Sequence, residues 1–326
     1  MFDDSLLDDP HTLDVRGQRL HHLAGTGARL RWDVSEEMAT IAQKLGGVLP
    51  RAVLVMGTEA RLVRAIVETG SPVPCVAWQQ ETLPAWTGAL DMVVILPSTK
   101  DWHIAGREAM KRGAMVFVVA SQSSLSVSEV SDFVSLPLVE DDPFVAALYA
   151  CKILDLLGVG TNLDLLGVAD TIDEVCDRCG PRHSLESNPA KNLACALADT
   201  IPLVWGESVL AARASRRVAE ALREATGVPA LAAGKLALLP LIETAPRRDV
   251  FADPFEEDTS SHDFCLLVLD DQEESPLSEL QEIAEFHHIR VDILRCVETH
   301  PVARYAGLLY QGLYAAAYLG LATVKE

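Results

Sequence analysis

Three short polar segments in the first half of the chain follow apolar runs, and their residue types suit the binding of a phosphate or a sugar. Hydroxyl groups, backbone amides and one ammonium group can together hold a phosphate, and the positive end of a following helix adds to the attraction. If the apolar runs are strands of one parallel sheet, these segments lie where ligands bind in such sheets. The candidate residues are Gly57 and Thr58 after the run 51–56, Ser98, Thr99 and Lys100 after the run 91–96, and Ser121, Ser123 and Ser124 after the run 114–120.

Each of these segments also has a purely structural interpretation, which the sequence leaves open. Thr58 can cap the helix that begins there through its hydroxyl, and Glu59 would repel a phosphate that approaches the same amides. Ser98 or Thr99 is an ordinary residue for the N-cap of the next helix. The segment 121–124 can be a polar loop without a ligand.

The pattern around these segments predicts alternating strands and helices. Short apolar runs rich in β-branched residues are typical of buried parallel strands, and amphipathic stretches lie between them. Such alternation predicts an α/β fold with a doubly wound parallel sheet. In the first half we expect strands at 51–57, 91–96 and 114–120, weaker strands at 73–77 and 133–137, and helices at 58–69, 101–112, 141–159 and 163–178.

The second half restarts this alternation, without a strong residue-level repeat between the halves. The stretch 179–189 between them is rich in turn residues and marks the predicted domain boundary. We therefore expect two α/β domains in tandem, at 1–180 with an N-terminal helical extension and at 181–326. The elements expected after the boundary are helices at 189–199, 207–225, 277–287 and 301–320, and strands at 200–206, 263–270 and 289–294.

Composition narrows the class of partner. The net charge is −20 and the sequence pI is about 4.8, which argues against a nucleic-acid partner because phosphate backbones need clustered Lys and Arg. No apolar run has the length that spans a bilayer, and the start of the chain lacks the pattern of a signal peptide. We therefore expect a cytoplasmic protein without a membrane partner.

The seven cysteines are scattered, which suits a reducing compartment. Cys176, Cys179 and His183 form a C-x2-C-x3-H pattern, but no second pair follows at the spacing of a zinc site. The pattern also lies near the end of a predicted helix, whereas a redox pair is expected where a helix begins. We interpret these thiols as incidental and expect neither a metal nor a cofactor.

Several segments along nearly the whole chain carry a resemblance to a known family. They are LDDPHTLDVRG (7–17), PVPCVAWQQETLPAWTG (72–88), NPAKNLA (188–194) with Ile201-Pro202 and Gly206, and GLLYQGLYAAAYLGLATV (307–324). In this order they resemble the sugar isomerase (SIS) double-domain family, in particular its bifunctional phosphoglucose/phosphomannose isomerase branch. The Asn-Pro-Ala-Lys segment followed by Ile-Pro is the most specific of them.

The resemblance implies a homodimer with two SIS domains in each chain, and a five-stranded parallel sheet of flavodoxin-like order in each domain. It implies a sugar phosphate, such as fructose 6-phosphate, bound near the domain and subunit interface. Enzymes of the family interconvert aldose and ketose 6-phosphates through a cis-enediol, which needs a phosphate anchor, an acid/base group and a carboxylate that moves a proton. The resemblance implies no metal.

The chain departs from the family's loops at each candidate segment. The first glycine turn reads Gly-Gly-Ser in the family, and Gly57-Thr58-Glu59 stands here. The main phosphate loop reads Ser-x-Ser-Gly-x-Thr in the family, and the stretch 97–101 here lacks its glycine. The next loop, Thr-Ser-Gly-Gly in the family, is replaced by the serine-rich stretch 121–124.

The catalytic groups of the family are also missing from their positions. Phe144 stands where the family has an arginine after a proline, and no neighbouring arginine in the sequence replaces it. The family's Pro-Glu-x-x-His-Asn stretch is absent, so Glu243 is the nearest carboxylate and the weak candidate for the proton shuttle; the apolar run 236–242 before it looks like packing. Gln311-Gly312 stands where the family has Gly-Asp.

The remaining cations of the second half give only open candidates. Lys191 or Arg217 could reach a pocket at an interface. We expect most of the arginines to lie on solvated faces or to pair with the acidic surface, and these are Arg213, Arg216, Arg217, Arg247 and Arg248.

The sequence therefore predicts a phosphosugar-binding protein related to the glucose/mannose-6-phosphate isomerases, with weakened or lost isomerase activity, acting as a sensor or regulator. One alternative is an active aldose–ketose isomerase with a rearranged site, and another is a purely structural protein that has lost ligand binding. Each acid/base group that is lost costs about 10²–10⁴-fold in rate, and this loss favours the first interpretation.

Overall fold

The computed structural model of this chain describes residues 2–32, 34–47, 49–97, 101–126, 133–245, 263–272 and 279–323. Its contacts group the chain into two compact units. We call Ala28–Leu166 the central unit, and Met1–Gly27 with Gly167–Glu326 the terminal unit. Each is built on one parallel sheet, so the predicted α/β class is confirmed. The division into domains at residues 180 and 181 stays a prediction.

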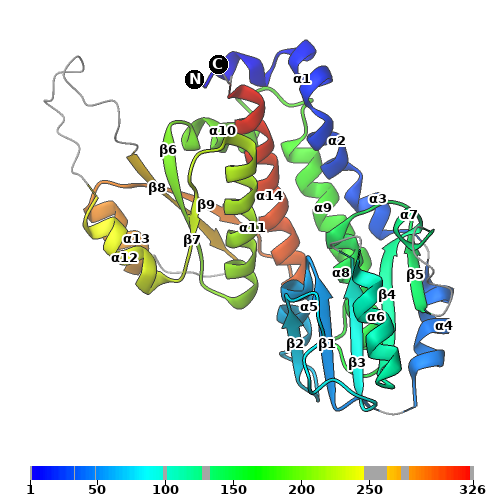
Figure 1. Ribbon diagram of the computed structural model, residues 1–326. Coiled ribbons are helices and arrows are strands. Elements are labelled where there is room, and N and C mark those ends of the chain that lie inside the picture. The colour runs from blue at the N-terminus through cyan, green and yellow to red at the C-terminus, as the bar shows by residue number, and fades with distance from the viewer. Residues whose placement is uncertain are drawn as a thin grey trace, which may run out of the picture. The chain divides into compact units, whose positions relative to one another are not determined.

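The central unit contains a five-stranded sheet of order β2-β1-β3-β4-β5, the predicted flavodoxin-like order (Figure 1). All neighbouring strands are parallel, with Gly57 opposite Leu96 and Ser121 opposite Leu138. The strands therefore end at one edge, which we call the carboxyl edge. The strands are β1 (Ala52–Gly57), β2 (Cys75–Trp78), β3 (Asp91–Leu96), β4 (Met115–Ser121) and β5 (Val134–Leu138).

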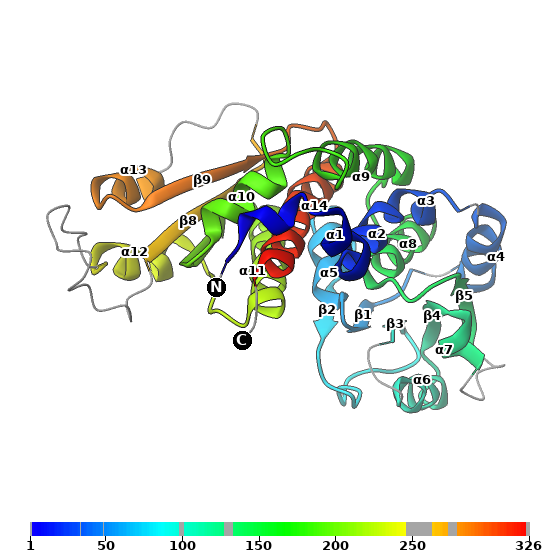
Figure 2. The ribbon, with the colours of Figure 1, turned by 90° about the horizontal axis from the view of Figure 1, so that it is seen from above.

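Helices cover both faces of this sheet, and Figure 2 shows α6 and α8 on opposite sides of it. One face packs on α6 through a core that includes Leu54, Val93 and Phe133. Gly106 of α6 lies so close to the Phe133 ring that a Cβ there would be 2.7 Å from it. The helices of the unit are α4 (Ser35–Leu45), α5 (Ala60–Val67), α6 (Trp102–Lys111), α7 (Gln122–Ser126) and α8 (Pro143–Leu156), and α3 (Thr26–Leu30) joins the two units in sequence.

The terminal unit contains a parallel sheet of order β7-β6-β8-β9. Numbered from its own first strand this order is 2-1-3-4, the same order as the first four strands of the central sheet. The resemblance implied five strands, and the described residues form four, so that expectation is corrected for this part of the chain. The strands are β6 (Thr200–Gly206), β7 (Leu231–Ala232), β8 (Asp263–Asp270) and β9 (Arg290–Arg295).

Helices α12 (Lys235–Glu243) and α13 (Glu279–Phe286) pack on one face of this sheet, and the core there includes Leu238, Ile242 and Leu280. The packing expected of the run 236–242 is therefore observed, although Leu236 is 84% exposed. Figure 1 shows α11 and α14 on the other side of the strands. The other elements of the unit are η1 (Asp4–Leu7), α1 (Pro10–Arg16), α2 (Gln18–Ala24), α9 (Leu165–Cys179), α10 (Pro189–Leu197), α11 (Val209–Thr226) and α14 (Pro301–Ala322).

Helix α14 is the centre of the terminal unit. Most of its residues are buried, and it packs against α10, α11 and η1. Gly312 and Gly320 permit a close approach to α11, because a Cβ at these positions would lie 2.3 Å from Val218 and 2.9 Å from Ala225. None of the helices in the described part of the chain combines the length and apolar character that a membrane crossing requires.

Candidate functional site

The carboxyl edge of the central sheet gathers the candidate residues that the structure describes. Gly57 ends β1 and Ser121 ends β4, and Thr58, Ser123 and Ser124 follow these strands directly. Three further candidates, Ser98, Thr99 and Lys100, lie outside the described residues. Loops at this edge of a parallel sheet are where a doubly wound fold binds its ligands.

Gly57 is fixed by the backbone of the neighbouring strand. Its φ is +111°, a conformation that residues with a Cβ rarely adopt. A Cβ built on it would lie 1.6 Å from the carbonyl oxygen of Leu96 on β3. The turn from β1 to α5 therefore requires glycine for packing, whether or not a ligand binds there.

The residues after Gly57 differ from the expected cap. The N-cap of α5 is Glu59 rather than Thr58, and the Glu59 side chain makes no capping hydrogen bond. Its backbone carbonyl accepts hydrogen bonds from the N–H groups of Leu62 and Val63. Thr58 is exposed, whereas Glu59 is only 3% exposed. A buried carboxylate thus lies at the helix N-terminus, where the helix dipole stabilises negative charge and where an anionic ligand would meet repulsion.

The three candidate serines after β4 form a hydroxyl cluster. Ser121 is buried, and its hydroxyl oxygen lies 2.9 Å from that of Ser123. The Ser124 backbone N–H donates to the Ser121 hydroxyl at 3.2 Å, and the Ser124 hydroxyl donates to Asp141 at 3.4 Å. The structure therefore brings the predicted serines together, next to a carboxylate that follows β5. Such a cluster can donate to sugar hydroxyls or to phosphate oxygens.

Two residues near this edge were not identified from the sequence. His103 is half-buried in the first turn of α6, directly after the segment 98–102, and imidazole is the usual side chain for acid/base work near neutral pH. The sequence feature that could have identified His103 is its position two residues after Asp101, near the start of a predicted helix.

The second residue is Arg29. It donates from Nε to the carboxylate of Asp142 at 2.9 Å, and Asp142 directly precedes Pro143. No arginine near Phe144 in the sequence marks this position, because Arg29 comes from a segment 113 residues before Asp142.

Arg29 does not restore the missing cation in a form that a substrate could use. Its second nitrogen lies 2.9 Å from the same Asp142 oxygen, and its third lies 3.7 Å from Glu140. Asp142 in turn accepts from the backbone N–H groups of Phe144 and Val145, both at 3.1 Å, and so caps α8. The arginine thus neutralises a buried capping carboxylate.

Glu243 is exposed at the last residue of α12. Helix α12 follows β7 and precedes the parallel strand β8, so it runs back along the sheet. Its last turn therefore lies toward the amino ends of the strands, away from the edge where ligands bind in such sheets. The geometry of its own sheet gives Glu243 no support as a proton shuttle, and that role stays a prediction.

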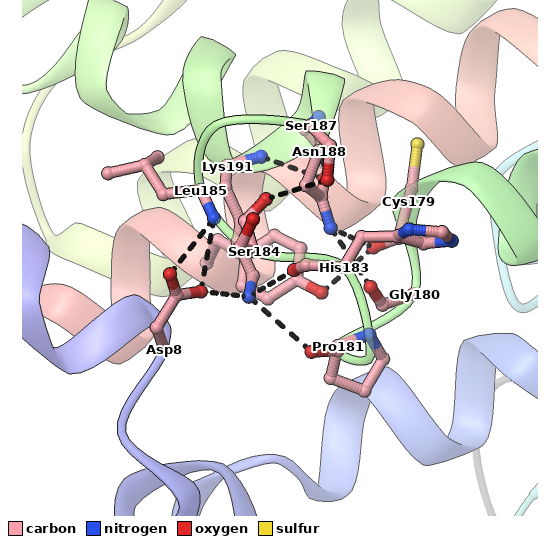
Figure 3. A network of polar contacts seen from close by, with 12 residues as sticks. Asp8, Cys179, Gly180, Pro181, His183, Ser184, Leu185, Ser187, Asn188 and Lys191 are labelled. Atoms are coloured by element: carbon pink, nitrogen blue, oxygen red, sulfur yellow. Dashed lines mark hydrogen bonds and ion pairs between the residues drawn. The ribbon is translucent and has the colours of Figure 1, made fainter.

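Lys191 lies in the interior of the terminal unit (Figure 3). It is 0% exposed, and its ammonium group donates to Asp8 at 2.6 Å and to the carbonyl of His183 at 2.8 Å. The same nitrogen lies 5.3 Å from the centre of the Tyr318 ring, within the range of a cation–π interaction. These contacts hold the ammonium group in place, so the expectation that Lys191 could reach an interface pocket has no support.

Asn188 holds the loop around this lysine (Figure 3). Its side-chain oxygen accepts from the N–H groups of Ala190 and Lys191, at 3.0 and 3.1 Å, and so caps α10. Its side-chain amide donates to the carbonyls of Cys179 and Gly180, at 3.0 and 2.9 Å. All four hydrogen-bonding positions of the amide are used, which explains why an asparagine stands at this turn.

Asp8 gives this network a dependence on pH. Partial burial acts to raise the pKa of Asp8, but hydrogen bonds from Leu185 and the Lys191 ammonium group outweigh it, so the pKa lies below its ordinary value. A carboxyl with a lowered folded-state pKa stabilises the fold above its unfolded pKa, and loses that contribution as pH falls through the folded value.

We therefore expect the stability advantage of the wild type over Asp8→Asn to be present at pH 6 and to shrink as the pH falls below about 4. Urea unfolding of both proteins between pH 6 and pH 3 measures this. Asp199→Asn, a change of an exposed carboxylate for which no hydrogen bond or ion pair is described, serves as the control. A difference between wild type and Asp8→Asn that stays constant over this range would contradict the expectation.

The other polar residues considered from the sequence are used structurally. Gln311 donates to the carbonyls of Arg295 and Gly307, both at 3.1 Å. Arg213 is buried, whereas Arg217 pairs with Glu220 at 2.5 Å, as expected of most of these arginines. Arg216 is exposed, and Arg247 and Arg248 lie outside the described residues.

The cysteine pattern shows no sign of redox activation. Cys179 is buried, and burial raises its pKa to about 11, away from the thiolate form that reacts or binds metal. Cys176 lies one turn before it, near the end of α9. Within the described part of the chain, no group of three or more His, Cys, Asp or Glu side chains is placed to hold a metal ion.

Comparisons with known proteins identify one segment of the chain by its sequence and support the fold of the whole chain. Residues 186–324 match the sequence model of a family described as the bacterial phospho-glucose isomerase C-terminal SIS domain. A comparison with curated proteins finds no match. The matched segment contains the terminal sheet, α10, α11 and α14, and excludes the carboxyl edge of the central sheet.

Solved structures resemble the chain over most of its length. A glucose-6-phosphate isomerase like protein from Thermus thermophilus is 20% identical, with a TM-score of 0.57 over 97% of this chain and 92% of that one. A protein from Bacillus subtilis, provisionally named a phosphosugar isomerase, is 13% identical, with a TM-score of 0.56 over 87% of this chain and 92% of that one. A protein from Salmonella typhimurium LT2, provisionally named a sugar binding protein, is 15% identical, with a TM-score of 0.66 over 93% of this chain and 98% of that one.

At these identities the likeness to solved structures establishes the fold. Residues 186–324 thus match a SIS domain of the bacterial phospho-glucose isomerase type, and the chain as a whole has the two-sheet α/β fold of tandem SIS-domain structures.

Proposed function

We propose that this chain binds a sugar phosphate at the carboxyl edge of the central sheet and acts as a sensor or regulator with little isomerase activity. The hydroxyl cluster of Ser121, Ser123 and Ser124 at the end of β4 carries this proposal. Hydroxyl donors at the end of a central parallel strand suit both a phosphate and the hydroxyls of a sugar. The names of two similar structures, which refer to a phosphosugar isomerase and to sugar binding, support the same ligand class.

Weak turnover is supported by the groups that occupy the catalytic positions. Phe144 stands in place of an arginine, and Arg29 nearby is held by Asp142 and Glu140. Glu243 is exposed and lies toward the amino end of its own sheet. Since each acid/base group contributes about 10²–10⁴-fold, a site without them binds its ligand more readily than it converts it.

One observation favours the alternative, an active glucose-6-phosphate or mannose-6-phosphate isomerase. His103 is half-buried in the first turn of α6 at the same edge as the hydroxyl cluster. A histidine at this place could open the sugar ring or move a proton. A homodimer, expected from the resemblance, would permit a base from the second subunit.

Two measurements separate these functions. Thermal-shift titration with fructose 6-phosphate, glucose 6-phosphate and mannose 6-phosphate measures binding, and a coupled assay measures interconversion. We expect a shift with at least one sugar phosphate, and turnover far below ordinary enzyme rates of about 1–10³ s⁻¹. Ordinary turnover that is lost in His103→Ala would establish the isomerase instead.

The site is tested by replacing Ser123 and Ser124 together with alanine, which is expected to weaken sugar-phosphate binding about tenfold or more. Each lost hydrogen bond to a charged group costs about 1.5–3 kcal/mol. Replacing the exposed Ser184 and Ser187 of the terminal unit in the same way provides a matched control. Equal binding by both double variants would place the ligand elsewhere.

Glu59→Gln is expected to increase the affinity for the sugar phosphate by about threefold to tenfold. The substitution removes one negative charge from the carboxyl edge at nearly constant shape, and so reduces repulsion of the phosphate. Isothermal titration with the sugar phosphate measures the change. Glu68→Gln, just after the other end of α5, is the matched control and should leave the affinity unchanged. Weaker binding by Glu59→Gln would show that Glu59 itself contacts the sugar.

A further inference from the structure

A small apolar pocket lies beside β5 in the central unit, at a place that the sugar-phosphate proposal does not use. Its cavity volume is about 180 Å³. The pocket lies between the connection from α3 to α4, the end of β5 and the start of α8. Its apolar lining includes Ala28, Trp32, Val34, Pro137, Val139 and Val145.

The wall of this pocket is held in place by partly buried hydrogen bonds. The hydroxyl of Tyr149 lies 2.8 Å from the carbonyl oxygen of Arg29 and 3.2 Å from that of Trp32. Burial raises the pKa of Tyr149 to about 12, so the hydroxyl keeps its proton for these carbonyls. The ion pair between Arg29 and Asp142 closes one end. The pocket therefore exists before any partner binds, which lowers the entropy cost of binding.

The rim of the pocket is acidic. The Glu140 side chain lines the pocket and is 59% exposed. One of its oxygens lies 3.7 Å from a nitrogen of Arg29, and Arg29 also pairs with Asp142. The exposed residues Glu36 and Glu37 follow Val34 in the first turn of α4, and the exposed Asp141 follows Glu140. The exposed Arg31 precedes Trp32 in the sequence. Among the described residues that line the pocket, Glu140 and Asp142 carry two negative charges against the one positive charge of Arg29, so the lining complements a positively charged partner.

The size of the pocket identifies the kind of occupant. Pockets for whole small molecules measure about 300–1,000 Å³, whereas an apolar cavity of about 150 Å³ holds a single benzene. At about 180 Å³ this pocket fits one large apolar side chain. Trp32 and Val139 beside it are 61% and 65% exposed, and they offer further apolar contact to the chain that carries such a side chain.

We propose that this pocket is an anchor site for a basic segment of a partner protein. An aromatic side chain of the segment fills the pocket, and a neighbouring Lys or Arg pairs with Glu140 on the acidic rim. Anchors of this kind, buried in a preformed pocket and surrounded by weaker contacts, carry most of the binding energy of small interfaces. The pocket adjoins the hydroxyl cluster, because Ser124 donates to Asp141, which lies in sequence between the lining residues Glu140 and Asp142. A partner bound here can therefore respond to the sugar phosphate that we propose for that cluster.

The test uses the full chain and short synthetic peptides with blocked ends, followed by chemical-shift titration of the isotope-labelled protein. The probe peptide is Ser-Gly-Trp-Arg-Lys-Gly-Ser. One control peptide replaces Trp with Ala, and another replaces Arg-Lys with Glu-Glu. We expect saturable shifts with the probe alone, at affinities in the millimolar range or better, centred on the residues that line the pocket.

Three variants locate the binding. Ala28→Trp fills the pocket from its rim and is expected to abolish the saturable shifts. If this variant folds poorly, Val139→Arg tests the same point, because its positive charge repels the basic peptide. Glu140→Lys is expected to weaken binding about fivefold or more, since it turns an attraction into a repulsion. Glu81→Lys, the same change in the loop after β2 at the other end of the sheet order, should leave the affinity within about twofold of the wild type.

The outcomes that overturn the proposal are distinct. Absence of saturable shifts with the probe excludes the anchor site, and equal binding of the Glu-Glu peptide excludes recognition of a basic segment. Sedimentation in which Ala28→Trp dissociates a dimer of the wild type would assign the pocket to a second copy of this chain. Each of these results is independent of whether sugar phosphates bind, because the sugar titration is read from separate measurements.

Discussion

Gly57→Ala is expected to lower the free energy of unfolding by about 4 kcal/mol or more, or to prevent folding of the central unit. Two effects add at this position. The φ of +111° lies in a region that alanine rarely adopts, and the new Cβ would lie 1.6 Å from the Leu96 carbonyl oxygen. That oxygen belongs to the backbone of a buried strand, so it cannot move without disturbing the ladder between β1 and β3.

Urea unfolding followed by circular dichroism measures this loss, and Gly47→Ala separates its two causes. Gly47 has a similar φ of +115°, but a Cβ there would meet no atom within 4 Å. We therefore expect Gly47→Ala to cost about 1–2 kcal/mol, the cost of the backbone conformation alone. Equal effects of the two substitutions would mean that β1 and β3 separate easily, and that Gly57 is not required by packing.

The three inner strands of the central sheet, β1, β3 and β4, could be predicted because their sequence is unambiguous. Runs such as 91–96 are buried on both faces, and all six residues of β3 are buried. Their β-branched composition therefore follows directly from their position in a parallel sheet. In contrast, β7 is a two-residue edge strand and α12 contains Pro240 within an apolar run, so neither shows a strand or helix period.

The site could be predicted only where its residues follow strands. The hydroxyl cluster follows β4 directly, and the alternation of strands and helices was enough to place it at the carboxyl edge. Arg29 and Asp142 are 113 residues apart, and no periodicity connects them. The same holds for Asp8 and Lys191, which are 183 residues apart. Long-range ion pairs of this kind depend on tertiary packing and leave no local signal.

The burial of Lys191 also shows how a chemically suggestive residue can be structural. The segment Asn188–Ala194 carries the resemblance to a family, but the resemblance does not say what the lysine does. In the structure its ammonium group joins η1 and the loop before α10 to α14, through Asp8, His183 and Tyr318. A buried cation with charge-assisted partners is stable only when all of them are present.

Lys191→Met is therefore expected to lower the free energy of unfolding by about 3 kcal/mol. The variant leaves the carbonyl of His183 and the carboxylate of Asp8 without their charged donor. Breaking a fully buried pair costs about 3–5 kcal/mol, and the value here lies at the low end because the Asp8 side chain is 45% exposed and partly solvated. Urea unfolding at pH 7 measures the change.

Lys235→Met is the matched control, since Lys235 pairs with Glu279 at a partly exposed position and should lose less than about 1 kcal/mol. A double-mutant cycle of Lys191→Met with Asp8→Asn should show coupling, because the second substitution removes the carboxylate that the first leaves unpaired. If Lys191→Met cost no more than Lys235→Met, the ammonium group would not be essential to the fold. Such a result would favour a role for Lys191 in a ligand site. The reason is that burying a lysine without a structural function costs desolvation free energy.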